Sequence, residues 1–328
     1  MTAASTLREL PDRALRATFL GLSQRRSLGR LATRLPITRA MVARFVAGET
    51  LDEALPVLEQ LRAAGLRTTV DLLGESVTAP AAASAAADGY IATLDALAAR
   101  DLDRNVSVKL SQMGLLLDPA IATANVRRIV ERATEHDAFV RIDMEDHSTT
   151  DATLAIWRSV RPPDRSHGDT GVVIQAALRR SGVDLDGIVG EAGRVRLCKG
   201  AYREPAAVAF GSRQDIDAAY EALMERLLRE GEFPALATHD ERLIRRAVAL
   251  VREHHIARDR FEFQMLYGVR RDLQQQLVAA GYGVRVYVPF GTEWYPYFMR
   301  RLAERPANVA FVLRSVMSEG RRGTRRPE

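Results

Sequence analysis

Eight short runs of β-branched and apolar residues recur along the chain, and longer segments with helical periodicity separate them. This alternation is typical of repeated βα units around a parallel sheet. The expected strands are residues 67–72, 106–110, 139–144, 172–176, 195–198, 235–238, 261–265 and 284–288. Eight such strands predict an α/β fold, a (β/α)8 TIM-like barrel. An open doubly wound sheet is the alternative, but no G-x-G-x-x-G motif follows any of the runs.

The length fits one barrel with extensions at both ends. The chain has 328 residues, of which 47% are hydrophobic, so it can bury a large core. A barrel needs about 250 residues, and we expect residues 61–319 to form the catalytic barrel. Residues 1–60 are expected to add helices that pack on the barrel. Residues 320–328 are expected to form a basic, flexible tail.

The net charge of +5 is distributed unevenly. Residues 1–44 carry a charge of +7 and residues 320–328 carry +3, which leaves an acidic body. No nucleic-acid-binding motif accompanies these basic ends, so we expect no nucleic-acid partner. The basic N-terminal segment is interpreted as a helix on the barrel wall. Contact with anionic lipid and a removable targeting segment are the alternatives.

The cysteine content and the hydropathy of the chain bear on its cellular location. Cys198 is the single cysteine, so the chain has no internal disulfide and no cysteine zinc cluster. No uncharged apolar run approaches the 18 or so residues that a membrane span needs. We therefore expect a cytoplasmic protein, with peripheral contact at the inner membrane surface as the alternative.

Lysine is nearly absent from the chain. Of the 47 cationic residues, all are arginine except Lys109 and Lys199. A lysine kept against this background indicates a position that needs a compact ammonium group on a flexible stem. The alternative is that both lysines survive by chance.

Polar residues stand at the carboxyl end of every expected strand, where barrel enzymes carry their chemistry. They are Asp71, Glu75, Lys109, Ser111, Asp143, Glu145, Gln175, Arg196, Lys199, Thr238, His239, Glu262, Gln264 and Tyr287. Charged groups are seldom buried without partners, so this set predicts a polar catalytic or binding mouth. The chain has no H-E-x-x-H motif and no H-x-H on the first strand, so we expect a site without metal.

The segment after the last strand predicts a final helix. Arg300 and Arg301 are adjacent, about 100° apart on a helix, and guanidinium pairs suit a carboxylate or phosphate. Glu304 is one turn away and is expected to orient Arg300. An exposed charged helix is the alternative. That reading leaves four aromatic residues without a surface to cover: Trp294, Tyr295, Tyr297 and Phe298.

Seven motifs together resemble the proline dehydrogenase family, FAD-dependent enzymes on a distorted (β/α)8 barrel. They are TVDLLGE at 69–75, VSVKLSQ at 106–112, RIDME at 141–145, RLCKGAY at 196–202, ATHD at 237–240, FEFQMLYG at 261–268 and RRLAERPAN at 300–308. The likeness runs in order from about residue 40 to residue 317. The length resembles the single-function bacterial form rather than the form fused to an aldehyde dehydrogenase. The resemblance also places the final helix over the mouth of the barrel.

The resemblance implies roles for individual residues. Lys109, Arg300 and Arg301 correspond to the residues that hold the proline carboxylate. Tyr287 corresponds to the residue on the pyrrolidine ring, and Glu75 to an acidic partner of Arg300. The implied catalytic pair is Asp143 and Arg196, with Arg196 beside the flavin N5. The implied FAD contacts are Met144, Gln175, Arg196, Lys199, Gly200, Ala201, Tyr202, Thr238, His239, Gln264 and Glu304.

The resemblance further implies a reaction and partners. L-proline would be oxidised to Δ1-pyrroline-5-carboxylate by hydride transfer to FAD, as the first step of proline catabolism to glutamate. Electrons would pass to a quinone, and the product to pyrroline-5-carboxylate dehydrogenase. The residues alone leave two alternatives open. One is a Schiff-base lyase that uses Lys109 or Lys199, and the other is a non-catalytic carboxylate-binding barrel.

Overall fold

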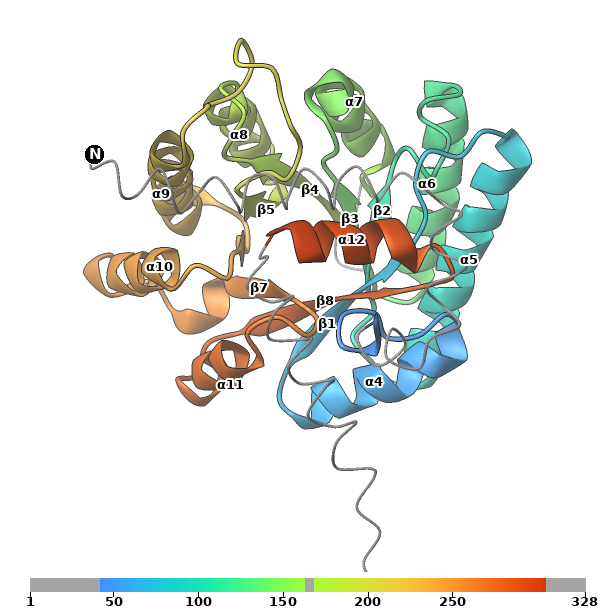
Figure 1. The fold of residues 1–328 in the computed structure, drawn as a ribbon, viewed down its shortest axis with the longest axis horizontal. Helices are drawn as coiled ribbons and strands as arrows, with labels where there is room; N and C mark the ends of the chain where they lie inside the picture. The colour runs from blue at the N-terminus through green and yellow to red at the C-terminus, as the bar shows by residue number, and fades with distance from the viewer. Residues whose placement is uncertain (1–41, 163–167, 305–328) are drawn as a thin grey trace, which may run out of the picture.

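The structure is a computed structural model that describes residues 42–162 and 168–304, apart from the side chains of residues 302–304. Eight parallel strands form a closed barrel in sequence order, as Figure 1 shows from one end. Their bounds are β1 Arg67–Leu72, β2 Asn105–Lys109, β3 Phe139–Asp143, β4 Asp169–Gln175, β5 Arg194–Cys198, β6 Ala235–Ala237, β7 Glu262–Leu266 and β8 Val284–Phe290. The predicted (β/α)8 fold is therefore confirmed.

All eight predicted strands are present, and their ends differ from the prediction where the neighbouring strand sets them. β4 begins at Asp169 rather than at residue 172, because Asp169 already pairs with Phe139 of β3. β8 continues to Phe290 rather than to residue 288, because Phe290 pairs with Leu72 of β1. Register with a neighbour extends a strand beyond its own apolar run.

Helices surround the barrel and alternate with the strands (Figure 1). Their bounds are α4 Leu51–Ala63, α5 Pro80–Ala99, α6 Pro119–Glu135, α7 Thr150–Val160, α8 Ser181–Gly190, α9 Arg213–Glu230, α10 Glu241–Glu253, α11 Arg271–Ala279 and α12 Trp294–Glu304. Two 3-10 helices, His147–Thr149 and Arg258–Arg260, occupy loops. The Asp240 side chain accepts a hydrogen bond from the Arg242 backbone N–H and so caps α10. Within the described ranges, no helix is long and apolar enough to cross a membrane.

The main core lies between the outer face of the barrel and its helices. Strand residues such as Val70, Val108 and Ile142 are fully buried there. Because side chains alternate along a strand, the residues between them point into the barrel. Many of these are polar, including Asp71 and Arg196, so the barrel interior is a polar network rather than an apolar core.

A second, separate cluster holds α12, which lies across the barrel in Figure 1. We call it the α12 cluster, and its buried members are Phe45, Val46, Leu73, Trp294, Tyr297, Phe298 and Met299. The rings of Phe45 and Phe298 lie 6.2 Å apart, and the Trp294 indole N–H donates to Glu49 at 3.0 Å. The aromatic residues of the final helix therefore cover the chain just before α4.

The terminal predictions fall mostly outside the described residues. Of the expected helical segment 1–60, residues 1–41 lie outside, and α4 packs against β1 and β8. The expected tail at residues 320–328 also lies outside.

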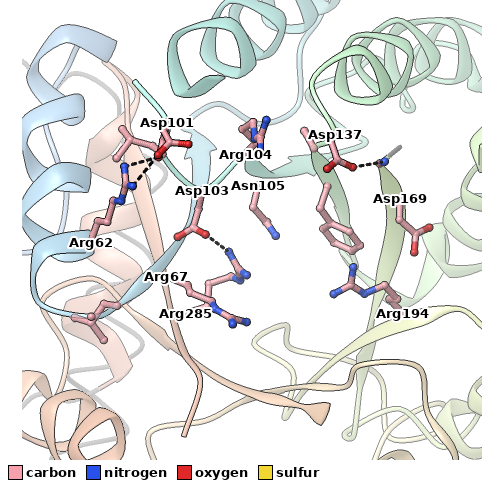
Figure 2. Close-up of a pocket in the computed structure, with 16 residues that line it drawn as sticks. Arg62, Arg67, Asp101, Asp103, Arg104, Asn105, Asp137, Asp169, Arg194 and Arg285 are labelled. Atoms are coloured by element: carbon pink, nitrogen blue, oxygen red, sulfur yellow. Dashed lines mark hydrogen bonds and ion pairs between the residues drawn. The ribbon is translucent and has the colours of Figure 1, made fainter. Parts of the chain in front are cut away.

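At the amino ends of the strands, a cavity of about 590 Å³ is lined by arginines and aspartates, among them Arg67, Asp103 and Arg285 (Figure 2).

Candidate active site

The carboxyl ends of the strands surround a cavity of about 610 Å³. All the residues to which the family resemblance assigns a role line it, except Gln175 and Glu304: Glu75, Lys109, Asp143, Met144, Arg196, Lys199, Gly200, Ala201, Tyr202, Thr238, His239, Gln264, Tyr287, Arg300 and Arg301. Of the other polar residues predicted for the mouth, Glu145 lines the cavity, whereas Asp71, Ser111 and Glu262 do not. Glu262 is at the first position of β7, away from the carboxyl end of that strand. Gln175 lies behind the lining, where its amide donates to the Glu145 carbonyl at 2.7 Å. The Glu304 side chain lies outside the described residues.

Lys109 is held at the end of β2 by a buried carboxylate. Its Nζ donates to Asp71 Oδ1 at 2.8 Å and to the Tyr287 hydroxyl at 3.2 Å. Burial alone would lower the pKa of Lys109, but Asp71, Asp143 and Glu75 together outweigh burial and raise it. Burial raises the pKa of Asp71, and Lys109 offsets only part of that rise. Lys109 therefore stays protonated and carries a fixed positive charge into the cavity.

Asp143 joins the ends of β3, β5 and β8. Its Oδ1 accepts from Arg196 Nη1 at 2.7 Å and from Ser107 Oγ at 2.8 Å. Its Oδ2 accepts from the Tyr287 hydroxyl at 3.0 Å. Burial, with help from Asp143 and Asp71, raises the pKa of Tyr287 well above its usual range. Tyr287 therefore remains a phenol that donates to Asp143.

The final helix brings its arginines to the cavity. Arg300 makes a two-pronged ion pair with Glu75, at 3.0 Å from Nη1 and 2.5 Å from Nη2. The Arg301 guanidinium lies 5.2 Å from the Tyr297 ring centre. The residue seen to orient Arg300 is thus Glu75, whereas the predicted role of Glu304 cannot be followed in the described side chains. The buried aromatic face of α12 excludes the exposed-helix alternative.

Lys199 lies in a different part of the lining and has two acidic partners. Its Nζ is 2.5 Å from Asp217 Oδ1 and 2.9 Å from Asp240 Oδ2. Gly200 follows with a positive φ of 104°, a conformation that side chains rarely adopt. A Cβ atom at Gly200 would lie 2.9 Å from Gln175 Oε1, so the backbone approaches Gln175 closely there.

Two observations fit these residues to a bound flavin. Arg196 Nη2 is a buried donor with no hydrogen-bond partner among the described residues, so the site offers a bond to an acceptor on a ligand. The cavity volume falls within the range of about 300–1,000 Å³ usual for ligand sites. Within residues 42–162 and 168–304, no group of three or more His, Cys, Asp or Glu is arranged to hold a metal ion.

The structure adds site residues that the predicted roles did not include. Asp71 and Glu145 were visible as strand-end acids, but their partners were not. Glu145 accepts from the Ser111 N–H at 2.8 Å and hydroxyl at 2.6 Å. Tyr90 lies inside α5 and donates to the Ser107 carbonyl at 2.9 Å beneath Asp71. No sequence signal marks a tyrosine in the middle of a helix as part of a site.

Fold and site together define a TIM barrel whose mouth is lined by cationic and acidic side chains, the arrangement of a barrel enzyme. The comparisons with known proteins are specific. The sequence profile of the Proline dehydrogenase family matches residues 54–314. The chain therefore belongs to the proline dehydrogenase family, as its motifs predicted, and is an oxidoreductase of proline catabolism. The family assignment leaves no support for the lyase or for the non-catalytic barrel.

Two relatives match nearly the whole chain. "Proline dehydrogenase 1" of Bacillus subtilis subsp. natto is 41% identical over 305 residues, which cover 93% of this chain and 100% of that protein. "Proline dehydrogenase" of Deinococcus radiodurans is 40% identical over 309 residues, which cover 93% and 99%. These lengths fit the single-function bacterial form.

A solved structure shares the fold over most of the chain. Proline utilization A from Bdellovibrio bacteriovorus, inactivated by N-propargylglycine, has a TM-score of 0.75 and 28% identity. The match covers 81% of this chain but only 32% of that longer chain. This chain therefore corresponds to about a third of that protein.

Proposed function

We propose that the chain oxidises L-proline to Δ1-pyrroline-5-carboxylate with bound FAD, as the first step of proline catabolism to glutamate. The observation that carries this proposal is the convergence of Lys109, Asp143, Arg196, Tyr287 and Arg300 on one cavity at the barrel mouth. The lining residues would hold FAD, which would supply a hydride acceptor at N5 for proline C5 and a route for the electrons to a quinone.

Three cations are proposed to bind the proline carboxylate. Lys109, Arg300 and Arg301 all line the cavity, and Asp71 and Glu75 orient the first two. Binding of the carboxylate at one end fixes the position of the ring and of C5 at the other, which lowers the entropic part of the barrier. Tyr287, held by Lys109 and Asp143, is proposed to pack on the pyrrolidine ring.

The reaction removes a hydride from C5 and a proton from the ring nitrogen, and a C=N bond forms between those atoms. The amine must lose its proton before the hydride leaves, so a base or a water molecule accepts that proton. Arg196 is proposed to supply a fixed positive charge beside the flavin ring system, and Asp143 is proposed to hold Arg196 in position. Asp143 and Arg196 are therefore the proposed catalytic pair.

The remaining lining residues are proposed to bind FAD. They are Met144, Gln175, Lys199, Gly200, Ala201, Tyr202, Thr238, His239, Gln264 and Glu304, together with Arg196. The Leu266 N–H donates to His239 Nε2 at 2.9 Å, which fixes the orientation of the imidazole at the lining.

The electron acceptor and location are further parts of the proposal. A quinone is proposed rather than NAD, because no dinucleotide fingerprint follows any strand. A cytoplasmic location is proposed, and the basic N-terminal segment provides an alternative contact with the inner membrane surface. The product would pass to pyrroline-5-carboxylate dehydrogenase.

The experiment is an anaerobic titration of the purified protein with L-proline, followed at the flavin absorbance. We expect a yellow protein that bleaches with proline and regains its colour with a quinone but not with NAD⁺. A Lys109→Met variant is the control, expected to bind flavin but to bleach at much higher proline concentration. A colourless protein, or a flavin that proline does not bleach, would contradict the proposal.

A further inference from the structure

Glu262 is a buried acid that lines neither cavity. It begins β7, two residues before Gln264, so both side chains point into the barrel. Only 3% of Glu262 is exposed. Arg67 and Arg285, which line the cavity at the amino ends of the strands (Figure 2), lie on one side of it. The proposed catalytic pair lies on the other.

One oxygen of Glu262 anchors a chain of hydrogen bonds that reaches the active site. Oε1 accepts from Arg285 Nε at 2.8 Å and from Gln264 Nε2 at 2.6 Å. The other end of the Gln264 amide, Oε1, accepts from Arg196 Nε at 2.5 Å. Arg196 Nη1 then donates to Asp143 and to Ser107. Two hydrogen bonds thus separate Glu262 from Arg196.

The chemistry of donors and acceptors allows only one direction for the hydrogen bonds between Glu262, Gln264 and Arg196. Burial alone would raise the pKa of Glu262, but Arg285, Gln264 and Arg67 outweigh it and lower the pKa, so Glu262 is ionised. An ionised carboxylate only accepts hydrogen bonds, and a guanidinium only donates them. The NH2 group of Gln264 must therefore face Glu262, and its oxygen must face Arg196. A neutral side chain at position 262 would accept either orientation of that amide, so Arg196 Nε alone would then select one.

We propose that Glu262 is a positioning residue for the oxidation reaction: it fixes the Gln264 amide so that Gln264 holds Arg196 in its catalytic orientation. This inference rests on the proposed function, because Arg196 and Gln264 are the residues assigned there to the flavin. Arg196 is held at Nε by Gln264 and at Nη1 by Asp143 and Ser107. The plane of the guanidinium is thereby fixed, and Nη2 has no partner among the described residues.

The test compares two variants that alter the same ion pair from opposite sides. Glu262→Gln keeps the size of the side chain but removes the obligatory acceptor. Arg285→Lys keeps a positive charge beside Glu262, so the carboxylate stays ionised and the Gln264 amide stays oriented, although the Arg285 bond to the Thr68 carbonyl at 2.6 Å is lost. Both variants are expected to lower the Tm of the holoenzyme.

Only Glu262→Gln is expected to change the chemistry. Its kcat should fall about tenfold or more, the size expected when one charge-assisted hydrogen bond is lost, while the KM for proline changes less than about twofold. Its flavin midpoint potential should become more negative, because Arg196 no longer holds its charge in place. Its crystal structure should show the Gln264 side chain and the Arg196 guanidinium shifted from their wild-type positions. Arg285→Lys should keep the wild-type potential and kcat.

A double variant, Glu262→Gln with Arg285→Gln, covers the case in which Glu262→Gln does not fold, because it removes both buried charges together and the charged groups that lose a partner, Arg67 and Asp103, are partly exposed. It should show the same low kcat and negative potential. A wild-type potential and kcat in either Glu262 variant would overturn the proposal, as would an equal change in Arg285→Lys. Failure of the proposed function itself is distinguishable, since proline would then fail to bleach the flavin of the wild-type protein.

Discussion

Arg300→Ala tests the carboxylate-binding end of the site. A hydrogen bond between charged groups is worth about 1.5 to 3 kcal/mol. Arg300 and Glu75 are 31% and 34% exposed, so solvent screening places the loss near the lower end, at about 1.5 kcal/mol. This energy corresponds to about a tenfold rise in the KM for proline. Flavin content should not change, because Arg300 is not among the proposed FAD contacts.

Two further variants, Arg300→Lys and Glu75→Gln, are expected to raise the KM for proline less than Arg300→Ala does. Arg300→Lys keeps the charge but loses the two-pronged geometry, so its KM should lie between wild type and Arg300→Ala. Glu75→Gln removes only the orienting charge of a partly exposed pair, worth about 0.2 to 1 kcal/mol, so its KM should rise at most about fivefold. Steady-state kinetics with a dye acceptor, with flavin content measured in parallel, gives the three values. An unchanged KM in flavin-replete Arg300→Ala would refute the reasoning, and so would a larger effect from Glu75→Gln.

Three other outcomes are expected. Lys109→Met leaves Asp71 without its cation, so its pKa rises further. The folded state then keeps a proton on Asp71 that the unfolded state releases above pH 3.8. The free energy of unfolding should therefore fall by about 1.4 kcal/mol per pH unit above pH 3.8, until the pKa of Asp71 in the folded state is reached. Denaturant titrations at a series of pH values measure this fall. Burial raises the pKa of Cys198 from 9.0 to about 11, so iodoacetamide at pH 8 should label it about a hundredfold more slowly than an ordinary thiol, and rapid labelling of the folded protein would refute this. Deleting residues 1–41 should lower the Tm without changing sedimentation with anionic liposomes, whereas lost sedimentation would favour the lipid alternative.

The architecture was predictable because short runs rich in β-branched and apolar residues alternate with segments of helical periodicity along the chain. Asp240 was predictable as a helix cap because that role depends on neighbouring residues alone. The ends of the strands were harder to predict, because Asp169 and Phe290 belong to strands through pairing with residues far away in sequence. Local patterns contain no information about such pairing.

The site residues also divide into those that local sequence indicates and those whose contacts depend on residues far away in sequence. Lys109 stood out because of its rarity and Asp143 because of its place at a strand end. Spacing along α12 indicated Glu304 as a partner of Arg300, and its side chain lies outside the described residues. The contact of Arg300 with Glu75, which lies far away in sequence, was implied by the family resemblance and not by local spacing. The interior pair of Glu262 and Arg285 joins two strands, and alternation alone did not show which polar residues inside the barrel would meet.

The separation of the α12 cluster from the main core has a consequence for motion. Regions with their own small set of apolar contacts open at a lower free energy than the surrounding structure, as amide hydrogen exchange detects. We therefore expect the last helix and the chain around Phe45 to open as a unit while the strands remain intact. Arg300 would move with this unit, whereas Asp143 and Arg196 belong to the strands. Such an opening would let an amino acid enter and leave without disturbing the proposed catalytic pair.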